Sequence, residues 1–196
     1  MVEIGRVCVF CGSSQTAAPI YFEAAERLGE AIRAAGMSLV YGGADVGLMG
    51  RVADAVLARG GEVRGVIPKH LVDREVAHRG LTELFVVGSM HERKAKMFDL
   101  ADAFVALPGG LGTLEEVFEM ATWAQLGLHQ KPIGVLDVAG FYASLRAFLD
   151  HATAAGLLQP AHRDLLFFDD EPARLLQTLR RASPPRFDAL LGREST

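Results

Sequence analysis

A short stretch of this sequence gathers groups that could bind a phosphate and act on the atoms beside it. An apolar, strand-like run ends at Pro108 and leads through glycines and a threonine to Glu115 and Glu116. Glycines allow a tight turn, and the backbone N–H groups at the start of the following helix would face an anion. Residues 109–113 are therefore predicted to bind a phosphate. A glycine turn followed by acids that the helix dipole favours in a first turn is the plainer alternative.

Two other junctions at the ends of predicted strands carry small residues that could reach the same ligand. Glycines recur over 41–50, and residues 11–14 include the hydroxyl of Ser13. Because the carboxyl ends of parallel strands line one crevice, we expect Ser13 and the backbone at Gly43 to contact the bound molecule. Close packing of a helix on the sheet explains the later glycines of the first run equally well.

Three cations, Arg93, Lys94 and Lys96, cluster near the start of a predicted helix over 90–101. Positive charge is unfavourable at the N-terminal end of a helix, which indicates that a bound anion compensates it. A solvated charged face explains Lys96 without any ligand.

Cys8 and Cys11 form a C-x-x-C pair, a spacing found in redox and zinc sites. They lie in a strand-like run, where positions three apart point to opposite faces. A zinc site would also need a second pair of ligands, which the sequence does not offer. We predict two small buried thiols and no metal site.

Short β-rich runs alternate with amphipathic stretches, a pattern typical of a parallel sheet with helices on both faces. Strands are expected near residues 7–11, 38–41, 62–67, 84–87, 103–107, 132–136 and 165–168. Helices are expected over 19–35, 47–59, 90–101, 114–126, 140–155 and 171–181. The fold class is thus α/β, a three-layer doubly wound parallel sheet of Rossmann-like type. It should form a single domain over residues 1–182, followed by a loosely ordered tail over 183–196.

The composition argues against nucleic-acid and membrane partners. The formal net charge is −4 at pH 7, so a broad basic surface for nucleic acid is not expected. No run approaches the roughly 20 apolar residues of a membrane helix. The start of the chain carries an acid where a signal peptide has basic residues, and we expect a cytoplasmic protein.

Four motifs together make the sequence similar to the LOG ("lonely guy") family of cytokinin riboside 5′-monophosphate phosphoribohydrolases, long mislabelled as lysine decarboxylases. The resemblance spans residues 6–181. It rests on the motifs Gly47–Gly50, Met90–Lys94, Pro108–Glu116 and Trp123–Pro132. Ala44 departs from the family pattern, which often has a third glycine there, and this bears on how closely that loop approaches a ligand.

This resemblance implies an enzyme that hydrolyses the N-glycosidic bond of a nucleoside 5′-monophosphate, AMP or an N6-modified AMP, to free base and ribose 5-phosphate. Arg93 matches the family's catalytic arginine, and Glu116 matches its catalytic glutamate. The positions that match substrate contacts are Glu75, Lys94, Gly109, Gly110, Leu111, Gly112, Thr113, Leu114, Glu115 and Thr122. The resemblance also implies a homodimer, with the helices after the glycine loops in contact. We expect neither a cofactor nor a metal.

The chemistry of that reaction suits the two matched residues. Cleavage builds oxocarbenium character on the ribose, which a carboxylate can stabilise while it orients or deprotonates water. Glu116 fits this role. Arg93 stays protonated and cannot act as a base, but it can orient Glu116, hold the phosphate or favour departure of the base. Phosphate bound to the backbone of 110–113 would position the reacting carbon through remote binding energy.

Other functions remain open from the residues alone. A non-catalytic nucleotide or cofactor carrier of the same fold would keep the glycine loops and could dispense with the Arg93 and Glu116 pair, whose presence favours an enzyme. A nicotinamide-dependent oxidoreductase is disfavoured because the dinucleotide fingerprint is missing after the first strand. A pyridoxal-phosphate decarboxylase needs a Schiff-base lysine, and no lysine of the chain lies in such a context.

Overall fold

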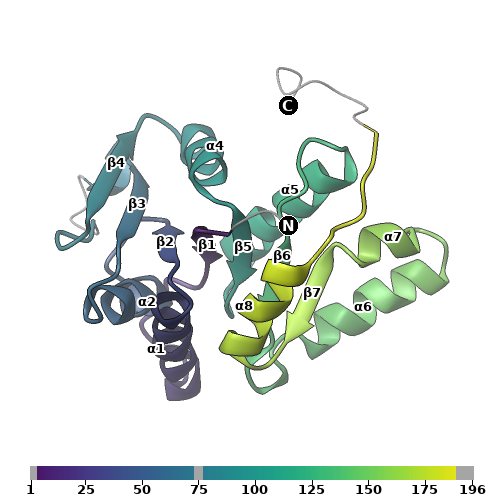
Figure 1. The fold of residues 1–196 in the computed structure, drawn as a ribbon, viewed down its shortest axis with the longest axis horizontal. Helices are drawn as coiled ribbons and strands as arrows, with labels where there is room; N and C mark the ends of the chain where they lie inside the picture. The colour runs from purple at the N-terminus through teal and green to yellow at the C-terminus, as the bar shows by residue number, and fades with distance from the viewer. Residues whose placement is uncertain (1–3, 73–76, 189–196) are drawn as a thin grey trace.

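The computed structural model describes residues 4–72 and 77–188. They form one sheet of seven strands in the order β4-β3-β2-β1-β5-β6-β7 (Figure 1), and neighbouring strands are parallel. The strands are β1 (Arg6–Phe10), β2 (Ser38–Tyr41), β3 (Val63–Pro68), β4 (Glu83–Val87), β5 (Ala103–Ala106), β6 (Ile133–Leu136) and β7 (Leu166–Asp169). The predicted α/β class with a Rossmann-like parallel sheet is confirmed.

Helices cover both faces of this sheet (Figure 1). They are α1 (Pro19–Ala34), α2 (Gly47–Leu57), α3 (Lys69–Val72), α4 (Met90–Leu100), α5 (Leu111–Gln125), α6 (Ala143–Ala154), α7 (Pro160–Arg163) and α8 (Pro172–Arg181). Side chains alternate along β1, so Val7 and Val9 enter the core with α1, α2 and α8, whereas Cys8 and Phe10 enter the core with α4, α5 and α6. The result is three layers. None of the described helices is long and apolar enough to cross a membrane.

The direction of winding reverses beside β1. From β1 the sheet extends through β2 and β3 to β4, and the chain then returns to place β5 on the other side of β1. The loops after these two neighbouring strands touch, because the N–H of Gly12 donates to the carbonyl oxygen of Pro108 at 3.0 Å. In such sheets ligands bind outside the carboxyl ends of the strands at this reversal. The fold therefore places two of the three predicted ligand loops side by side.

The helix after β5 begins at Leu111, earlier than the predicted start at Leu114. Gly110 is its N-cap, and Gly112 and Thr113, which the pattern assigns to a loop, belong to the first turn. Glycine has a weak helix propensity, so this start is hard to see in the sequence. Glu115 and Glu116 consequently lie in the second turn of α5, and the prediction that placed them in the first turn is wrong.

Smaller differences from the predicted elements have local causes. The predicted helix over 140–155 is a short 3-10 turn, η1 (Val138–Gly140), followed by α6, because Ala139 takes a left-handed φ of 51°. The helices α3 and α7 are too short to show a helical period in the sequence. Residues 183–188 carry no helix or strand, and the rest of the predicted tail lies outside the described residues.

The two cysteines lie on opposite faces of the sheet, as predicted. Cys8 is buried in the core with α4 and α5, and Cys11 packs against the opposite core. Both thiols are free. Burial, reinforced by the negative charge of Glu116, holds the pKa of each thiol well above its usual range. Both therefore stay protonated, as expected for packing residues and not for a redox pair.

Candidate active site

A cavity of about 300 Å³ opens at the crevice beside β1, between the loop after this strand and the first turns of α4 and α5. Ser13, Arg93 and Glu116 line it, together with the backbone of 110–113. Three methionines, Met49, Met90 and Met97, belong to its apolar lining. The structure thus brings the predicted phosphate loop and the two predicted catalytic side chains into one pocket.

Arg93 joins a strand to a helix across this cavity. Its Nε donates to the carbonyl oxygen of Val66 at 3.1 Å, and its Nη1 donates to Oε1 of Glu116 at 3.4 Å. The side chains of Arg93 and Glu116 are each 11% exposed. A planar guanidinium can make both contacts at once and still present further N–H donors to a ligand. β3 therefore fixes the orientation of Arg93 towards Glu116.

The guanidinium of Arg93 occupies space that any larger residue would take at position 42. A Cβ on Gly42 would lie 1.8 Å from Nη2 of Arg93 and 2.4 Å from Cε of Met49. Sequence reasoning missed Gly42 and selected its neighbour, Gly43. Gly43 makes the turn with a φ of 75° and does not belong to the cavity lining. The paired glycines were the available signal, but only the fold shows which of the two faces the ligand.

Glu116 is a buried acid with an unusual proton affinity. It is 8% exposed. Burial raises its pKa to about 7, against the opposing effect of Arg93, and the charge of Glu115 adds to the rise. The helix dipole acts mainly within the first turn, so it does not explain an acid in the second turn. The plainer interpretation of Glu116 as a first-turn acid is therefore wrong, and the pair with Arg93 is what compensates its charge.

This raised pKa makes a prediction about stability. The folded state disfavours ionisation of Glu116, so stability falls as pH rises from the usual carboxyl value of 4.5 to about 7 and stays lowered above it. Glu116→Gln removes this cost. Below pH 4.5 we expect the variant and the wild type to have the same unfolding free energy. Above pH 7 the unfolding free energy of the variant should be about 3 kcal/mol higher. Urea unfolding across this pH range measures the difference, and a constant difference would contradict the burial effect.

The glycine loop combines tight packing with an open side. A Cβ on Gly109 would lie 2.8 Å from the backbone nitrogen of Gly12, so glycine is required there by the fold. At Gly110 and Gly112 a Cβ would meet no atom within 4 Å, and neither residue has a positive φ. The described protein therefore does not itself require glycine at these two positions. Close approach of a ligand to the backbone N–H groups of this first turn explains both.

Several other predicted contacts lie away from this cavity. Lys94 lines a neighbouring cavity with Glu119, and its Nζ donates to Glu119 and to Glu115, which lines the candidate cavity itself. Thr122 lies more than one helical turn after Glu116 on α5 and lines a separate small cavity. Leu114 packs against the core. Glu119 was missed, although its four-residue spacing from Glu115 signals a shared helix face. Glu75 lies outside the described residues.

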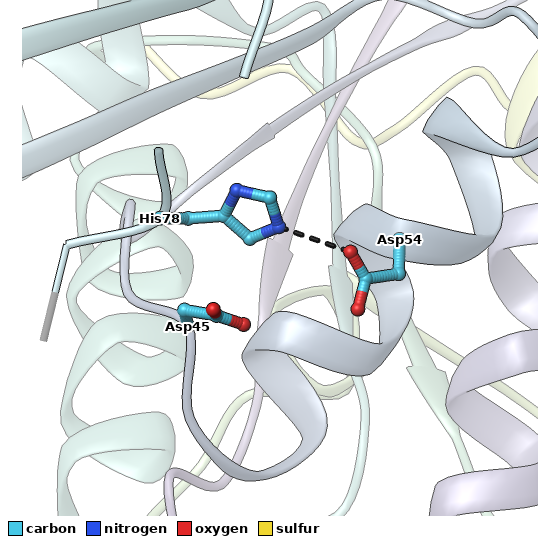
Figure 2. Close-up of side chains that lie close together, drawn as sticks. All are labelled: Asp45, Asp54 and His78. Carbon is cyan, nitrogen blue, oxygen red and sulfur yellow. Dashed lines mark hydrogen bonds and ion pairs between the residues drawn. The ribbon is translucent and has the colours of Figure 1, made fainter. Parts of the chain in front are cut away.

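One cluster among the described residues has the ligand types of a metal site. Candidate ligand atoms of Asp45, Asp54 and His78 lie within 4.8 Å of one another (Figure 2). Nε2 of His78 is 3.0 Å from Oδ1 of Asp54, and the N–H of Gly80 donates to Nδ1 at 3.1 Å. Because Nδ1 accepts, the ring proton lies on Nε2 and is donated to Asp54. A metal-bound imidazole has the reverse arrangement, so this cluster is better explained as a structural hydrogen bond to α2.

Comparisons with known proteins identify the family of this chain. A family model described as "Possible lysine decarboxylase" matches residues 49–179. The probable cytokinin riboside 5′-monophosphate phosphoribohydrolase LOGL9 of Oryza sativa subsp. japonica is 51% identical over 179 residues, 91% of this chain and 79% of that protein. The cytokinin riboside 5′-monophosphate phosphoribohydrolase LOG7 of Arabidopsis thaliana is 48% identical over 185 residues, 94% of this chain and 85% of that protein.

Solved structures share the fold at lower identity. The molybdenum cofactor binding protein from Rippkaea orientalis has a TM-score of 0.69 and 20% identity, and the match covers 92% of this chain and 98% of that one. A likeness at this identity shows the fold alone. The family match and the curated relatives at 51% and 48% identity show more: this chain belongs to the LOG family of cytokinin riboside 5′-monophosphate phosphoribohydrolases.

Proposed function

We propose that this chain hydrolyses the N-glycosidic bond of a nucleoside 5′-monophosphate and releases the free base and ribose 5-phosphate. The observation that carries the proposal is the buried pair of Arg93 and Glu116 in a cavity that ends at the first turn of α5. The names of the relatives support the same reaction. The substrate is AMP or an N6-modified AMP.

The phosphate binds to the first turn of α5. The N–H groups of Leu111, Gly112 and Thr113 have no partner within a helix at these positions, and Gly110 has no side chain to cap them. They carry the positive end of the helix dipole towards the ligand. The bound phosphate orients the ribose towards Glu116, which explains why a monophosphate is preferred over the free nucleoside.

Glu116 acts at the ribose carbon. As the bond to the base breaks, its electron pair leaves with the base and positive charge develops on C1′ and the ring oxygen. The carboxylate of Glu116 stabilises this charge and accepts a proton from the water that attacks C1′. With a pKa of about 7, Glu116 is substantially ionised at neutral pH and still basic enough to take that proton. Arg93 holds the carboxylate in place, and the three methionines pack against the base.

A non-catalytic carrier is the rival function. The neighbours of this fold include a protein named as a molybdenum cofactor binder, at 20% identity. A carrier needs affinity, but it does not need a buried carboxylate that faces the cavity and destabilises the fold when ionised. The position and proton affinity of Glu116 favour hydrolysis.

The deciding experiment is release of base and ribose 5-phosphate from AMP and from its N6-isopentenyl derivative. Release of base supports the hydrolase, and the ratio of kcat/KM values for the two substrates identifies the preferred base. Binding of AMP without release of adenine, over hours at micromolar protein, would favour the carrier.

A Gly42→Ala variant tests the geometry of the pair. The new methyl group displaces the guanidinium of Arg93, because the nearest atoms are side-chain ends of Arg93 and Met49 that can move. We expect kcat/KM to fall about a hundredfold, since an Å-scale misplacement of a catalytic group has this effect. The melting temperature should change little. A Gly5→Ala variant serves as the control, because Gly5 precedes the opposite end of β1, has no positive φ, and would place its Cβ at an ordinary 3.6 Å from Oδ2 of Asp102. Unchanged turnover in Gly42→Ala would contradict the assigned role of Arg93.

We also propose the assembly and setting of the enzyme. It is a cytoplasmic homodimer whose residues 1–182 form one enzyme domain, and it acts without nucleic acid, a cofactor or a metal. The net charge of −4 supports the absence of a nucleic-acid partner. The exposed apolar side chains of Met90 and Leu111 at the cavity rim support a contact between copies near the site. Sedimentation at working concentration tests this, and a monomeric mass would contradict the dimer.

A further inference from the structure

A buried tyrosine outside the candidate cavity holds the start of the loop proposed to bind the phosphate. The hydroxyl of Tyr142 donates to the carbonyl oxygen of Leu107 at 2.7 Å, and Tyr142 is only 3% exposed. Leu107 directly precedes Pro108 and the glycine loop. Burial raises the pKa of the Tyr142 hydroxyl, so this group keeps its proton and remains a donor at every working pH. The bond therefore joins the start of α6 to the residue from which the loop departs.

The carbonyl group of Leu107 lies just beyond the paired part of the sheet. The last paired residue of β5 is Ala106, which lies opposite Phe10 of β1 and Val135 of β6. The N–H of Leu107 still donates to the carbonyl oxygen of Phe10 at 2.9 Å, but the strand pairing ends there. Leu107 is fully buried, and a buried carbonyl oxygen without a donor is costly. Tyr142 therefore supplies the partner that the neighbouring strands no longer provide.

Tyr142 is itself held by a strained turn. Its N–H donates to Oδ1 of Asp137 at 2.7 Å, and the N–H of Asp137 donates to the carbonyl oxygen of Asp169, the last residue of β7, at 2.8 Å. Between Asp137 and Tyr142 the chain passes through Ala139, a non-glycine residue with a left-handed φ of 51°. Backbone strain of this kind persists only where the surrounding structure fixes it. Tyr142 thus stands on a rigid support at the ends of β6 and β7.

The first turn of α5 depends on such support, because the protein does not pack against its open side. A Cβ on Gly110 or Gly112 would meet no atom within 4 Å. The chain is held just before this turn instead. The carbonyl oxygen of Pro108 accepts a hydrogen bond from the loop after β1 at 3.0 Å, and that of Leu107 accepts the one from Tyr142. These two bonds fix consecutive carbonyl groups, and they set the direction of the N–H groups that follow.

We propose that Tyr142 is a positioning residue for the phosphate: through the carbonyl group of Leu107 it fixes the N–H groups at the start of α5. This inference rests on the part of the proposed function that binds the phosphate to that turn. Donors that are already oriented bind a ligand more tightly, and these donors face only the phosphate. Loss of the Tyr142 hydroxyl should therefore weaken ligands that carry a phosphate and spare those that do not. A merely structural bond would affect both kinds of ligand alike.

The test measures the affinities for AMP, ribose 5-phosphate and adenosine by calorimetric titration. All proteins carry Glu116→Gln, which keeps the ligands intact. Tyr142→Phe keeps the ring and removes only the hydroxyl. We expect the Kd values of AMP and ribose 5-phosphate to rise about tenfold, the worth of one hydrogen bond, while that of adenosine stays within about twofold. Tyr41→Phe is the matched control and should leave all three values unchanged, because the Tyr41 hydroxyl is buried but has no hydrogen-bond partner among the described residues.

Two variants of Asp137 decide the matter if Tyr142→Phe does not fold. Asp137→Ala removes the acceptor for the N–H of Tyr142. It should weaken AMP and ribose 5-phosphate about threefold, again without an effect on adenosine. Asp137→Asn retains an acceptor oxygen and should restore both affinities.

These affinities do not depend on turnover. If the protein with Glu116 intact releases no adenine, the proposed hydrolysis fails, but the comparison of ligands with and without phosphate still tests the role of Tyr142. Equal losses for AMP and adenosine in Tyr142→Phe, or an unchanged Kd for ribose 5-phosphate, would overturn the proposal. A parent protein that binds AMP no more tightly than adenosine would overturn it as well, because the phosphate would then contribute nothing.

Discussion

The Glu116→Gln variant is expected to bind AMP and to release adenine with a kcat about a thousandfold below that of the wild type. Glutamine keeps the shape of the side chain and can still contact Arg93. It cannot accept a proton from water, and it places no negative charge opposite the developing positive charge on the ribose. Single-turnover release of adenine measures the loss, and calorimetric titration with AMP shows whether binding survives.

The pH profile provides the internal control for this variant. The carboxylate is the active form and the pKa of Glu116 is about 7, so wild-type kcat/KM should rise about tenfold from pH 6 to pH 8. This limb should disappear in Glu116→Gln. The matched control is Glu30→Gln. Glu30 is an exposed acid on α1 that pairs with Arg59, away from the candidate site. Turnover in Glu116→Gln within tenfold of the wild type would end the catalytic assignment.

Arg93→Lys is expected to lower kcat/KM about a hundredfold, although it preserves the positive charge. Arginine bonds the carbonyl oxygen of Val66 through Nε and Glu116 through Nη1 at the same time. A lysine has one nitrogen at the end of its chain and cannot reproduce this fork. The carboxylate of Glu116 would lose its fixed orientation, and donors aimed at the ligand would be lost with it.

The comparison with Arg93→Ala separates charge from geometry. If the charge alone mattered, Arg93→Lys would stay near wild-type activity while Arg93→Ala lost it. If the fork matters, both variants should fall by similar factors. Arg59→Lys controls for the loss of a guanidinium, because Arg59 follows the C-terminal end of α2 and forms an exposed pair with Glu30 of α1. Wild-type turnover in Arg93→Lys would contradict the role assigned to the contact with Val66.

The layout of the fold was predictable because its strands are continuous apolar runs with glycine and proline at their ends. Seven such runs alternate with amphipathic stretches, and the structure has seven strands near those positions. The candidate pair could also be predicted from the sequence, because Arg93 and Glu116 belong to motifs of fixed order. Their shared cavity then follows from the reversal of winding beside β1, which a parallel sheet imposes on the loops at its carboxyl edge.

The direction in which individual side chains point could not be predicted from the sequence. Lys94 and Arg93 are neighbours in the sequence, yet on a helix they point about 100° apart and reach different cavities. The start of α5 could not be predicted because glycine has a weak helix propensity and does not signal a first helical turn. Glycine is nevertheless compatible with this turn, whose N–H groups have no partner within the helix. Gly42 and Gly43 are identical residues, and only the packing against Arg93 separates their roles.

The burial of Glu116 has a consequence for how this activity can be lost. Ionisation of the Glu116 carboxylate lowers the stability of the folded state. Selection for stability therefore acts against a glutamate at this position, and only selection for turnover preserves it. A lineage released from the need for hydrolysis would gain a more stable protein through a single substitution to glutamine, with its phosphate loop intact. Descendants of such an enzyme can therefore become ligand carriers without passing through a weakened fold, whereas the return to catalysis must overcome a loss of stability.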